Sequence, residues 1–300
     1  MASSSISKLV IIGVGLIGGS FAQALRRAGL VKHITGIGRS PENMQCALEL
    51  GIIDEQIGDF AAALSGADFV LLAVPVKQAA RILQQIAPYL EARTIVSDVG
   101  STKQSVVDAA RAYLGKHISY FIPAHPIAGT ELSGAEAASP DLFQNKPVIL
   151  TPLQENDQQA IDYVTALWRY CGARVSSMQP EQHDQILAAI SHLPHMLAFS
   201  LMQHIQTQSL TLSEGNPLEL LRLAGSSLNG MTRIAASSPE MWRDICLDNR
   251  IALLAQIEAY QLELSKLQQI LIDHDSEALE KLFSEARVTR RNWSALGNNS

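Results

Sequence analysis

A short apolar run that passes directly into a glycine-rich turn is the strongest constraint on how this chain folds. Residues 8–12 read KLVII, and GVGLIGGS follows at once. In this GxGxxG spacing, Gly13 permits a tight turn, Gly15 lets a bound group approach the backbone, and Gly18 lets a helix pack closely on a strand. A helix that opens here offers unpaired N–H groups to phosphate. The turn predicts a dinucleotide site, the alternative being a glycine turn without a ligand; its candidate residues are Gly13, Gly15, Leu16, Ile17 and Gly18.

Short runs rich in β-branched residues alternate with helical stretches through the first part of the chain. Continuous apolar strands that alternate with helices indicate a parallel sheet covered on both faces. The helical stretches include residues 20–29 and 76–90. We therefore predict an α/β fold in which residues 1–178 form a Rossmann-type, doubly wound parallel sheet. The runs expected to form strands are residues 8–12, 33–37, 68–74, 94–99, 120–124, 147–151 and 173–178.

The strands stop near residue 179, and the remaining sequence is helical in pattern. The helix expected over residues 237–272 has a clear beginning, because a serine cap is followed by Pro239 in the first turn. The polar residues 287–300 are expected to be mobile. The expected helices are residues 179–206, 218–225 and 237–272.

Residues 179–300 therefore form an all-α second domain in this prediction. The helix at 237–272 carries much apolar surface at helical spacing, and such a helix usually needs a partner. We expect a homodimer through the helical domain, although burial within the domain would explain the same pattern.

Composition excludes several classes of protein. Apolar residues make up 47% of the chain and charged residues 17%, so a sizeable core can form. The net charge of −6 argues against a nucleic-acid partner, which needs a basic surface. The three cysteines are scattered and form no metal or disulfide pattern, and no segment is read as a targeting or membrane-spanning sequence. We expect a cytoplasmic protein that acts on a small molecule without a metal or a membrane.

The second expected strand bears on the choice of dinucleotide. An NAD site usually has a carboxylate about 20 residues after the glycine motif, to bind the ribose hydroxyl. Here the corresponding position is Gly38, and Arg39 and Ser40 follow. A guanidinium and a hydroxyl suit a 2′-phosphate, so we favour NADP. In the alternative, Arg39 is a solvated charge and NAD is bound.

Three further stretches lie where strands of the sheet should end. They are AVPV at 73–76, SDVGSTK at 97–103 and PAHPIAGTE at 123–131. Ligands bind at the carboxyl ends of parallel strands, so Val74 and Pro75 are candidate cofactor contacts. His125 is a candidate general base, because a histidine exchanges a proton near neutral pH. Ser101 either hydrogen-bonds the imidazole or the substrate, or caps the helix that follows.

Six motifs in order give the chain a resemblance to a known family. They are GVGLIGGS, AVPV, SDVGSTK, HPIAGTELSG, SHLPH and MTRIAASSPEMWRDI, and they extend over about residues 8–290. Together they resemble prephenate dehydrogenase, in the arogenate (cyclohexadienyl) dehydrogenase group of tyrosine biosynthesis. The resemblance implies oxidative decarboxylation of a cyclohexadienol with hydride transfer to NAD(P)+. It also implies that His125 accepts the hydroxyl proton and that Ser101 orients His125 and touches the hydroxyl.

The resemblance assigns the substrate's carboxylates to the helical domain. Arg233 matches the family's arginine that binds the side-chain carboxylate, although spacing alone would make it a surface charge. His192 would point into the active site, whereas buried structural roles for His192 and His195 are the alternative. Trp242 would pack over the pocket or belong to the core. Asn229 stands where several family members have lysine or arginine, which bears on the choice between prephenate and arogenate.

Two other functions are compatible with this fold. A β-hydroxyacid-type dehydrogenase would use a helical lysine as its acid and base, and none stands out over residues 179–208. A non-catalytic NADP sensor would not need His125, Ser101 and Arg233 together.

Overall fold

The computed structural model describes residues 5–130 and 132–298. The chain divides into two compact units, residues 1–249 and 250–300. All the candidate residues named above belong to the first unit, and each unit is described by itself.

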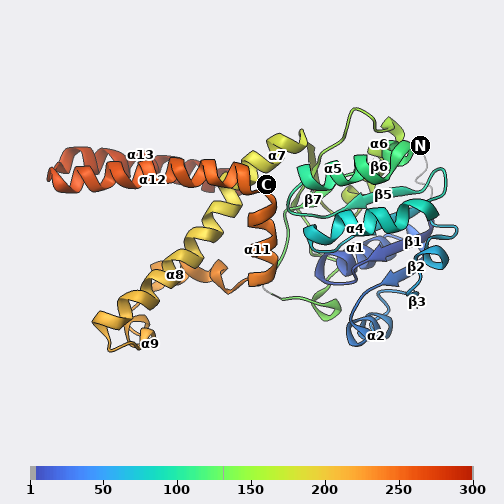
Figure 1. Ribbon diagram of the computed structural model, residues 1–300, viewed down its shortest axis with the longest axis horizontal. Helices are drawn as coiled ribbons and strands as arrows, with labels where there is room; N and C mark the ends of the chain where they lie inside the picture. Colours follow the sequence, from blue (N-terminus) through green and yellow to red (C-terminus); the bar gives the residue numbers. More distant parts are fainter. Residues whose placement is uncertain (1–4, 131, 299–300) are drawn as a thin grey trace. The chain divides into compact units, whose positions relative to one another are not determined.

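The first unit contains a parallel sheet with the strand order β3-β2-β1-β4-β5-β6 (Figure 1). The central strand β1 pairs in parallel with β2 on one side and β4 on the other, so the order of connection reverses there. This doubly wound arrangement agrees with the prediction, and ligands bind at such a reversal point. The strands are β1 Ile6–Ile12, β2 Val31–Ile37, β3 Glu55–Gln56, β4 Phe69–Leu72, β5 Ile95–Asp98 and β6 Phe121–Ile122.

Alternate residues of β1 supply two separate cores. Leu9 and Ile11 belong to one apolar cluster, together with residues of α1 and α6. Val10 and Ile12 belong to the other, together with residues of α3, α4 and α5. Both faces of the sheet are therefore covered, which explains why its strands are apolar throughout. The helices are α1 Leu16–Arg27, α2 Pro41–Glu49, α3 Phe60–Leu64, α4 Val76–Ile86, α5 Gln104–Tyr113 and α6 Gln158–Tyr170.

A second, three-stranded sheet corrects part of the strand prediction. Its strands are β7 Ala124–Pro126, β8 Pro147–Leu150 and β9 Arg174–Ser177, with β7 antiparallel to β8. The expected strand 120–124 is thus two strands in different sheets. Pro123 lies at the division and has no N–H to continue a ladder. His125 consequently lies within a strand, paired with Ile149, and not in a loop.

The helical part of the first unit also differs in detail from the prediction. The stretch expected as one helix is α7 Pro180–Leu187, a π-helical turn at Ala188–His192, and α8 Leu193–Leu212. Pro194 cannot donate to a preceding carbonyl, which explains why the wider turn lies just before it. The remaining helices are α9 Pro217–Leu221, α10 Ser226–Thr232 and α11 Pro239–Asp248, with a 3₁₀ turn at Arg233–Ala236.

The long helix expected over 237–272 is also divided. The predicted cap is present, because Ser238 Oγ accepts from the N–H of Met241 at 3.3 Å. However, α11 ends at Asp248, and Asn249 has φ −95° and ψ 30°. The Asn249 side chain donates to the carbonyl of Asp184 at 2.7 Å, a contact that holds this residue at the break.

Within the described residues, one helical stretch, Pro180–Leu212, is long and apolar enough to cross a membrane by length and composition alone. The stretch also contains the buried polar side chains His183, Asp184 and His192. Helices of soluble protein cores satisfy the same criterion, so the feature does not by itself indicate a membrane.

The second unit consists of α12 Arg250–Ile272 and α13 Ser276–Asn298. Residues 287–298 of the end that was expected to be mobile continue α13, and residues 299–300 lie outside the described residues. Large apolar side chains of both helices are exposed in the single chain, among them Ile251, Leu262, Leu271, Phe283 and Trp293. Such surface is typical of an interface.

Candidate active site

The glycine turn has the geometry that its spacing predicts. Gly13 has φ +100°, and a Cβ there would lie 2.2 Å from the carbonyl oxygen of Ala73. A Cβ on Gly18 would lie 2.4 Å from the carbonyl oxygen of Gly13. Gly15 is different, because nothing lies within 4 Å of the position a Cβ would take. The chain therefore packs tightly on both sides of one open position, which fits the approach of a pyrophosphate.

The first turn of α1 is open to an anion. Leu16 and Ile17 are its first residues, and no side chain of the described residues caps it at Gly15. Val74 lies next to the turn, since its Cγ1 is 3.2 Å from the Cβ position of Gly13, and Pro75 caps α4 beside it. Asn43, which belongs to no motif, donates to the carbonyl of Val14 at 2.6 Å and accepts from the N–H of Ala135 at 2.8 Å. It fixes the turn to the loop that follows β7.

The end of β2 carries the residues expected to select the dinucleotide. Arg39 is exposed and follows Gly38 directly. Ser40 caps α2, because its Oγ accepts from the N–H of Asn43 at 3.2 Å and donates to Glu42 Oε2 at 2.8 Å. Hydrogen bonds from its own backbone and from Ser40 lower the pKa of Glu42. Glu42, the carboxylate at this end of β2, is therefore hydrogen-bonded to Ser40, the cap residue of α2.

His125 is part of a buried hydrogen-bonded chain. Its Nδ1 lies 2.8 Å from His183 Nε2, and His183 Nδ1 lies 2.8 Å from Asp184 Oδ1. Asp184 also accepts from the backbone N–H groups of Lys103 at 2.8 Å and Gln104 at 2.9 Å. Residues of α7 therefore reach across to the first turn of α5 and to β7.

A buried ion pair supports the strand of His125 from the other side. The side chains of Lys103 and Asp98 are 0% and 3% exposed, and Lys103 Nζ also donates to the carbonyl of Ala124 at 2.8 Å. Asp98 accepts from the N–H groups of Gly100 at 2.8 Å and Ala124 at 3.3 Å. The residue that precedes His125 is thus held at both its N–H and its carbonyl.

Ser101 is half-buried and lies between these groups in sequence. Among the described residues it makes no side-chain hydrogen bond to His125, whose Nδ1 faces His183 instead. It does not cap α5 either, because Asp184 accepts from the N–H groups at that helix end. Its hydroxyl therefore remains available to a substrate.

The surroundings of His125 favour its neutral form. Burial lowers the pKa of His125 well below its usual value, and so do the charge that Lys103 carries and the charges that His183 and His192 carry when they are protonated. Burial likewise lowers the pKa of His192 to about 4, against the opposing effect of Asp184. Both imidazoles are neutral near pH 7, so His125 is able to accept a proton.

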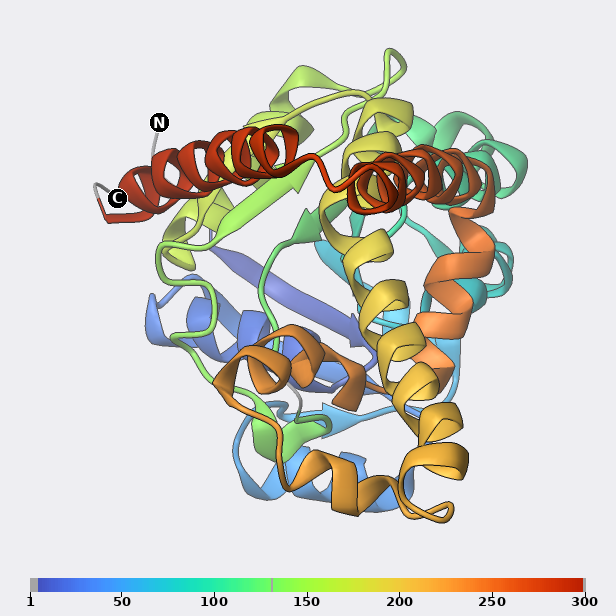
Figure 2. The same ribbon diagram turned by 90° about the vertical axis from the view of Figure 1, so that its left-hand side faces the viewer.

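A second group of candidates lies where α8 approaches α11, the yellow and orange helices side by side in Figure 2. The ring of His195 stacks on Trp242 with centroids 3.5 Å apart and an angle of 20°. His192 meets the same indole edge-on at 6.0 Å, and its Nδ1 lies 3.0 Å from Asn249 Nδ2. The charge of Arg233 contributes to a lowered pKa of His195, after burial. Through His192 this group extends toward His125.

Asn229 lies in a different environment. It lines a cavity of about 410 Å³ between α8, α9 and α10, together with Met202, Leu221 and Thr232. The structure therefore associates Arg233, His195 and Trp242 with one another, and Asn229 with this neighbouring cavity. The sequence offered for His195 only the alternative of a buried structural role; its stacking on Trp242 and the effect of Arg233 on its pKa are tertiary features.

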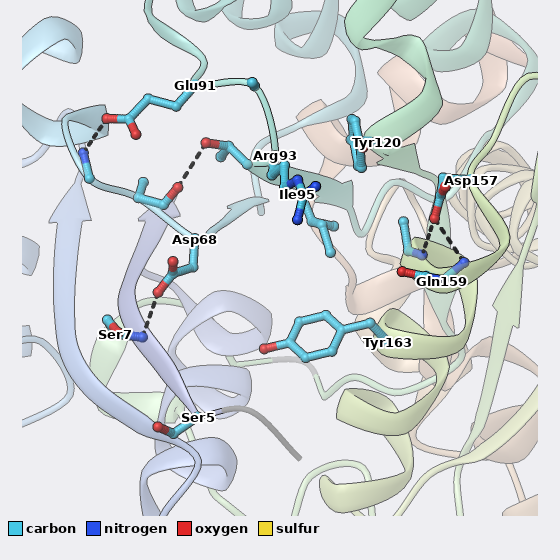
Figure 3. A pocket seen from close by; sticks show the side chains of 15 residues that line it. Ser5, Ser7, Asp68, Glu91, Arg93, Ile95, Tyr120, Asp157, Gln159 and Tyr163 are labelled. Atoms are coloured by element: carbon cyan, nitrogen blue, oxygen red, sulfur yellow. Dashed lines mark hydrogen bonds between the residues drawn. The ribbon is translucent and has the colours of Figure 1, made fainter. Parts of the chain in front are cut away.

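Another cavity, of about 780 Å³, lies at the opposite, amino ends of β1, β4 and β5 (Figure 3). Its carboxylates maintain the fold: Asp68 accepts from the N–H of Ser7, Glu91 from that of Gly66, and Asp157 caps α6. No three His, Cys, Asp or Glu side chains in the described part of the chain come together as a metal site.

Comparison with known proteins gives a consistent result along the chain. Residues 21–177 match the model of the prephenate dehydrogenase nucleotide-binding domain, and residues 179–285 match that of the prephenate dehydrogenase dimerization domain. The chain is 38% identical to prephenate dehydrogenase of Bacillus subtilis, over 94% of this chain and 75% of that protein. It is 35% identical to cyclohexadienyl dehydrogenase of Zymomonas mobilis, over 94% of each chain.

A solved structure is similar throughout. Prephenate dehydrogenase from A. aeolicus, in complex with hydroxyphenyl propionate and NAD+, superposes with a TM-score of 0.89 at 35% identity, over 96% of this chain and 98% of that one.

Proposed function

Because this chain belongs to the prephenate dehydrogenase family, we propose that it oxidatively decarboxylates prephenate to 4-hydroxyphenylpyruvate, arogenate to tyrosine, or both. A nicotinamide cofactor, held by the turn at Gly13–Gly18, supplies the hydride acceptor. The observation that carries the proposal for the chemistry is His125, a buried imidazole kept neutral beside the carboxyl ends of the parallel strands.

The protein's part in the reaction is to hold a ring and to move one proton. The ring carbon that bears the hydroxyl loses its hydrogen as hydride, while His125 accepts the hydroxyl proton. The bond to the ring carboxylate then breaks, CO2 leaves, and the electron pair of that bond completes the aromatic ring. His125 returns the proton to the ring oxygen, so the balance closes on a phenol.

We assign the remaining contacts from the same geometry. Ser101 donates to or accepts from the substrate hydroxyl, since it has no other side-chain partner among the described residues. Arg233 binds the side-chain carboxylate as a planar, two-pronged donor, with His195 and Trp242 forming the wall next to it. His192, which is buried and bonded to Asn249, contacts the edge of Trp242 and is near enough to His125 to affect its pKa. Asn229 lines the neighbouring cavity and adds no charge there, which favours acceptance of both pyruvyl and alanyl side chains.

NADP is the proposed cofactor. Arg39 presents its cation beyond the end of β2, and α2 begins beside it with Ser40 at its cap. The proposed contacts of Leu16, Ile17, Val74 and Pro75 do not discriminate between the dinucleotides. The test is Arg39→Ala, which should raise KM for NADP at least tenfold while leaving KM for NAD within about twofold. Equal effects on the two cofactors would refute the assignment.

The assembly follows from the family's second domain. We propose that residues 1–178 and 179–300 act as the cofactor-binding and substrate-binding domains, and that the exposed apolar side chains of the helices form a homodimer in the cytoplasm.

The activity is tested with four assays on the purified protein. Prephenate and arogenate are each combined with NAD+ and NADP+, and reduced cofactor is followed at 340 nm. Formation of CO2 and of a phenol with the reduced cofactor is expected, fastest with NADP+. No activity in any combination would contradict the proposed function and would favour a non-catalytic NADP-binding protein.

A further inference from the structure

We propose that His183 and Asp184 are positioning residues that fix the tautomer of His125 and share the positive charge it acquires during the reaction. The proposal rests on the assignment of His125 as the base. It adds two residues, and it states which nitrogen of His125 carries the proton before the reaction. Both residues lie on α7, outside the motifs that identify the base.

The first step concerns the charge of Asp184. Burial disfavours its ionised form, but hydrogen bonds from His183 and from the N–H groups of Gln104 and Lys103 hold the pKa of Asp184 below its usual value. These donors face both carboxylate oxygens, Oδ1 toward His183 and Lys103 and Oδ2 toward Gln104. Asp184 is therefore an anion that only accepts hydrogen bonds.

The second step fixes the protons on the two imidazoles. An accepting carboxylate requires a proton on His183 Nδ1, 2.8 Å away. When His183 carries only this proton, its Nε2 is a lone pair that accepts from His125 Nδ1 at 2.8 Å. The proton of neutral His125 is consequently on Nδ1, and its Nε2 carries the lone pair. Reversing any one proton would place two donors or two acceptors in contact within a buried site.

The third step concerns the charge formed when His125 accepts a proton at Nε2. Lys103 from the start of α5, His183 from α7 and His192 from the π-helical turn act on it directly. Behind them, Asp98 of β5 is bonded to Lys103, and Asp184 of α7 is bonded to His183. Lys103 is paired with Asp98, so Asp184 is the anion left to balance a new cation. The Nδ1–H of His125 already points along the chain toward it, and the cation is stabilised through His183.

The protonation pattern can be observed directly by long-range 1H–15N NMR correlation on protein labelled at histidine. The signals of His125 are identified by their loss in His125→Asn. We expect an Nδ1–H tautomer for His125 in the unmodified protein near pH 7. An Nε2–H tautomer would overturn the proposal, whatever the activities of the variants.

Two substitutions separate positioning from packing. In His183→Gln the amide oxygen can still accept from His125 Nδ1, whereas in His183→Leu nothing can. We expect kcat to fall about 10- to 100-fold in the Leu variant and to be largely retained in the Gln variant, with KM little changed in both. The Leu variant should also lose the single tautomer of His125. His117→Leu is the matched control, because His117 bonds the carbonyl of Thr94 away from this chain of residues.

The outcomes distinguish this proposal from the proposed function. If His125→Asn is inactive but His183→Leu keeps full kcat and the same tautomer, the relay is wrong and the base assignment stands. If His125→Asn keeps full kcat, the base assignment fails, and the NMR result alone then decides whether the hydrogen-bonded chain exists. Equal loss of kcat in the Gln and Leu variants would also refute tautomer control.

Discussion

Replacing Lys103 by methionine should destabilise the protein strongly, because it removes one half of a buried ion pair. The Lys103 side chain is 0% exposed and that of Asp98 is 3% exposed, so water cannot take the place of the lost ammonium. Asp98 would keep only its hydrogen bonds from the N–H groups of Gly100 and Ala124. Breaking a buried pair in this way costs about 3–5 kcal/mol.

That cost is large compared with the stability of an ordinary domain, roughly 5–15 kcal/mol. It corresponds to a change in the folding equilibrium of about two to three and a half powers of ten. The second variant, Lys103→Met combined with Asp98→Asn, removes the uncompensated charge but keeps an oxygen to accept from Gly100 and Ala124. It should recover at least half of the lost free energy.

The measurement is urea unfolding of the three proteins, followed by tryptophan fluorescence and by circular dichroism. The reasoning fails if Lys103→Met lowers the free energy of unfolding by less than about 1 kcal/mol, a value typical of an exposed pair. It also fails if the double variant is no more stable than the single one.

The same substitution has a second, kinetic consequence. The charge of Lys103 lowers the pKa of His125, so its removal raises that pKa. The protonated, inactive form of the base then persists to higher pH, and the acid limb of the kcat/KM profile should move upward in Lys103→Met. A limb that moves downward would contradict the placement of this cation beside the base.

Three further predictions test other parts of the site. His125→Asn should lower kcat on the order of 10²–10⁴-fold with little change in substrate affinity measured by calorimetry, whereas an unchanged kcat would exclude it as the base. Arg233→Ala should mainly raise KM, and a pure kcat effect would argue against a carboxylate contact. Gly15→Ala should melt like the unmodified protein but bind cofactor weakly, while Gly13→Ala should melt lower, because its Cβ would meet Ala73; identical melting temperatures would contradict this difference.

The parts of the fold that the sequence predicted well are those with local causes. Gly13, Gly15 and Gly18 are spaced by the needs of one turn, and the apolar strands alternate with helices over short distances. Pro123 was a local signal for the end of a strand, since it lacks the N–H that a ladder needs, and it was overlooked. The break at Asn249 has no comparable signal, because its cause is a hydrogen bond to a residue 65 positions away.

The candidate site shows the same division. His125 is recognisable from its motif, but its partner His183 is 58 residues distant and lies in an unremarkable helical stretch. Lys103 and Asp98 were both within a motif that the sequence singled out, yet only their burial reveals that they form a pair. Spacing does not distinguish His195 from His192, whereas in the structure His195 stacks on Trp242 and His192 meets that ring edge-on and contacts Asn249.

The carboxylate of Asp184 accepts from the first N–H groups of α5 and also bonds His183, the partner of His125. These two roles affect the order in which the site can form during synthesis. The nucleotide-binding turn and its neighbours, up to Pro75, leave the ribosome more than a hundred residues before Asp184 does. The first turn of α5 and the orientation of His125 must both wait for α7 to dock. During synthesis, His125 can therefore take up this orientation only after α7 has been made, so the base acquires its partner long after the glycine turn leaves the ribosome.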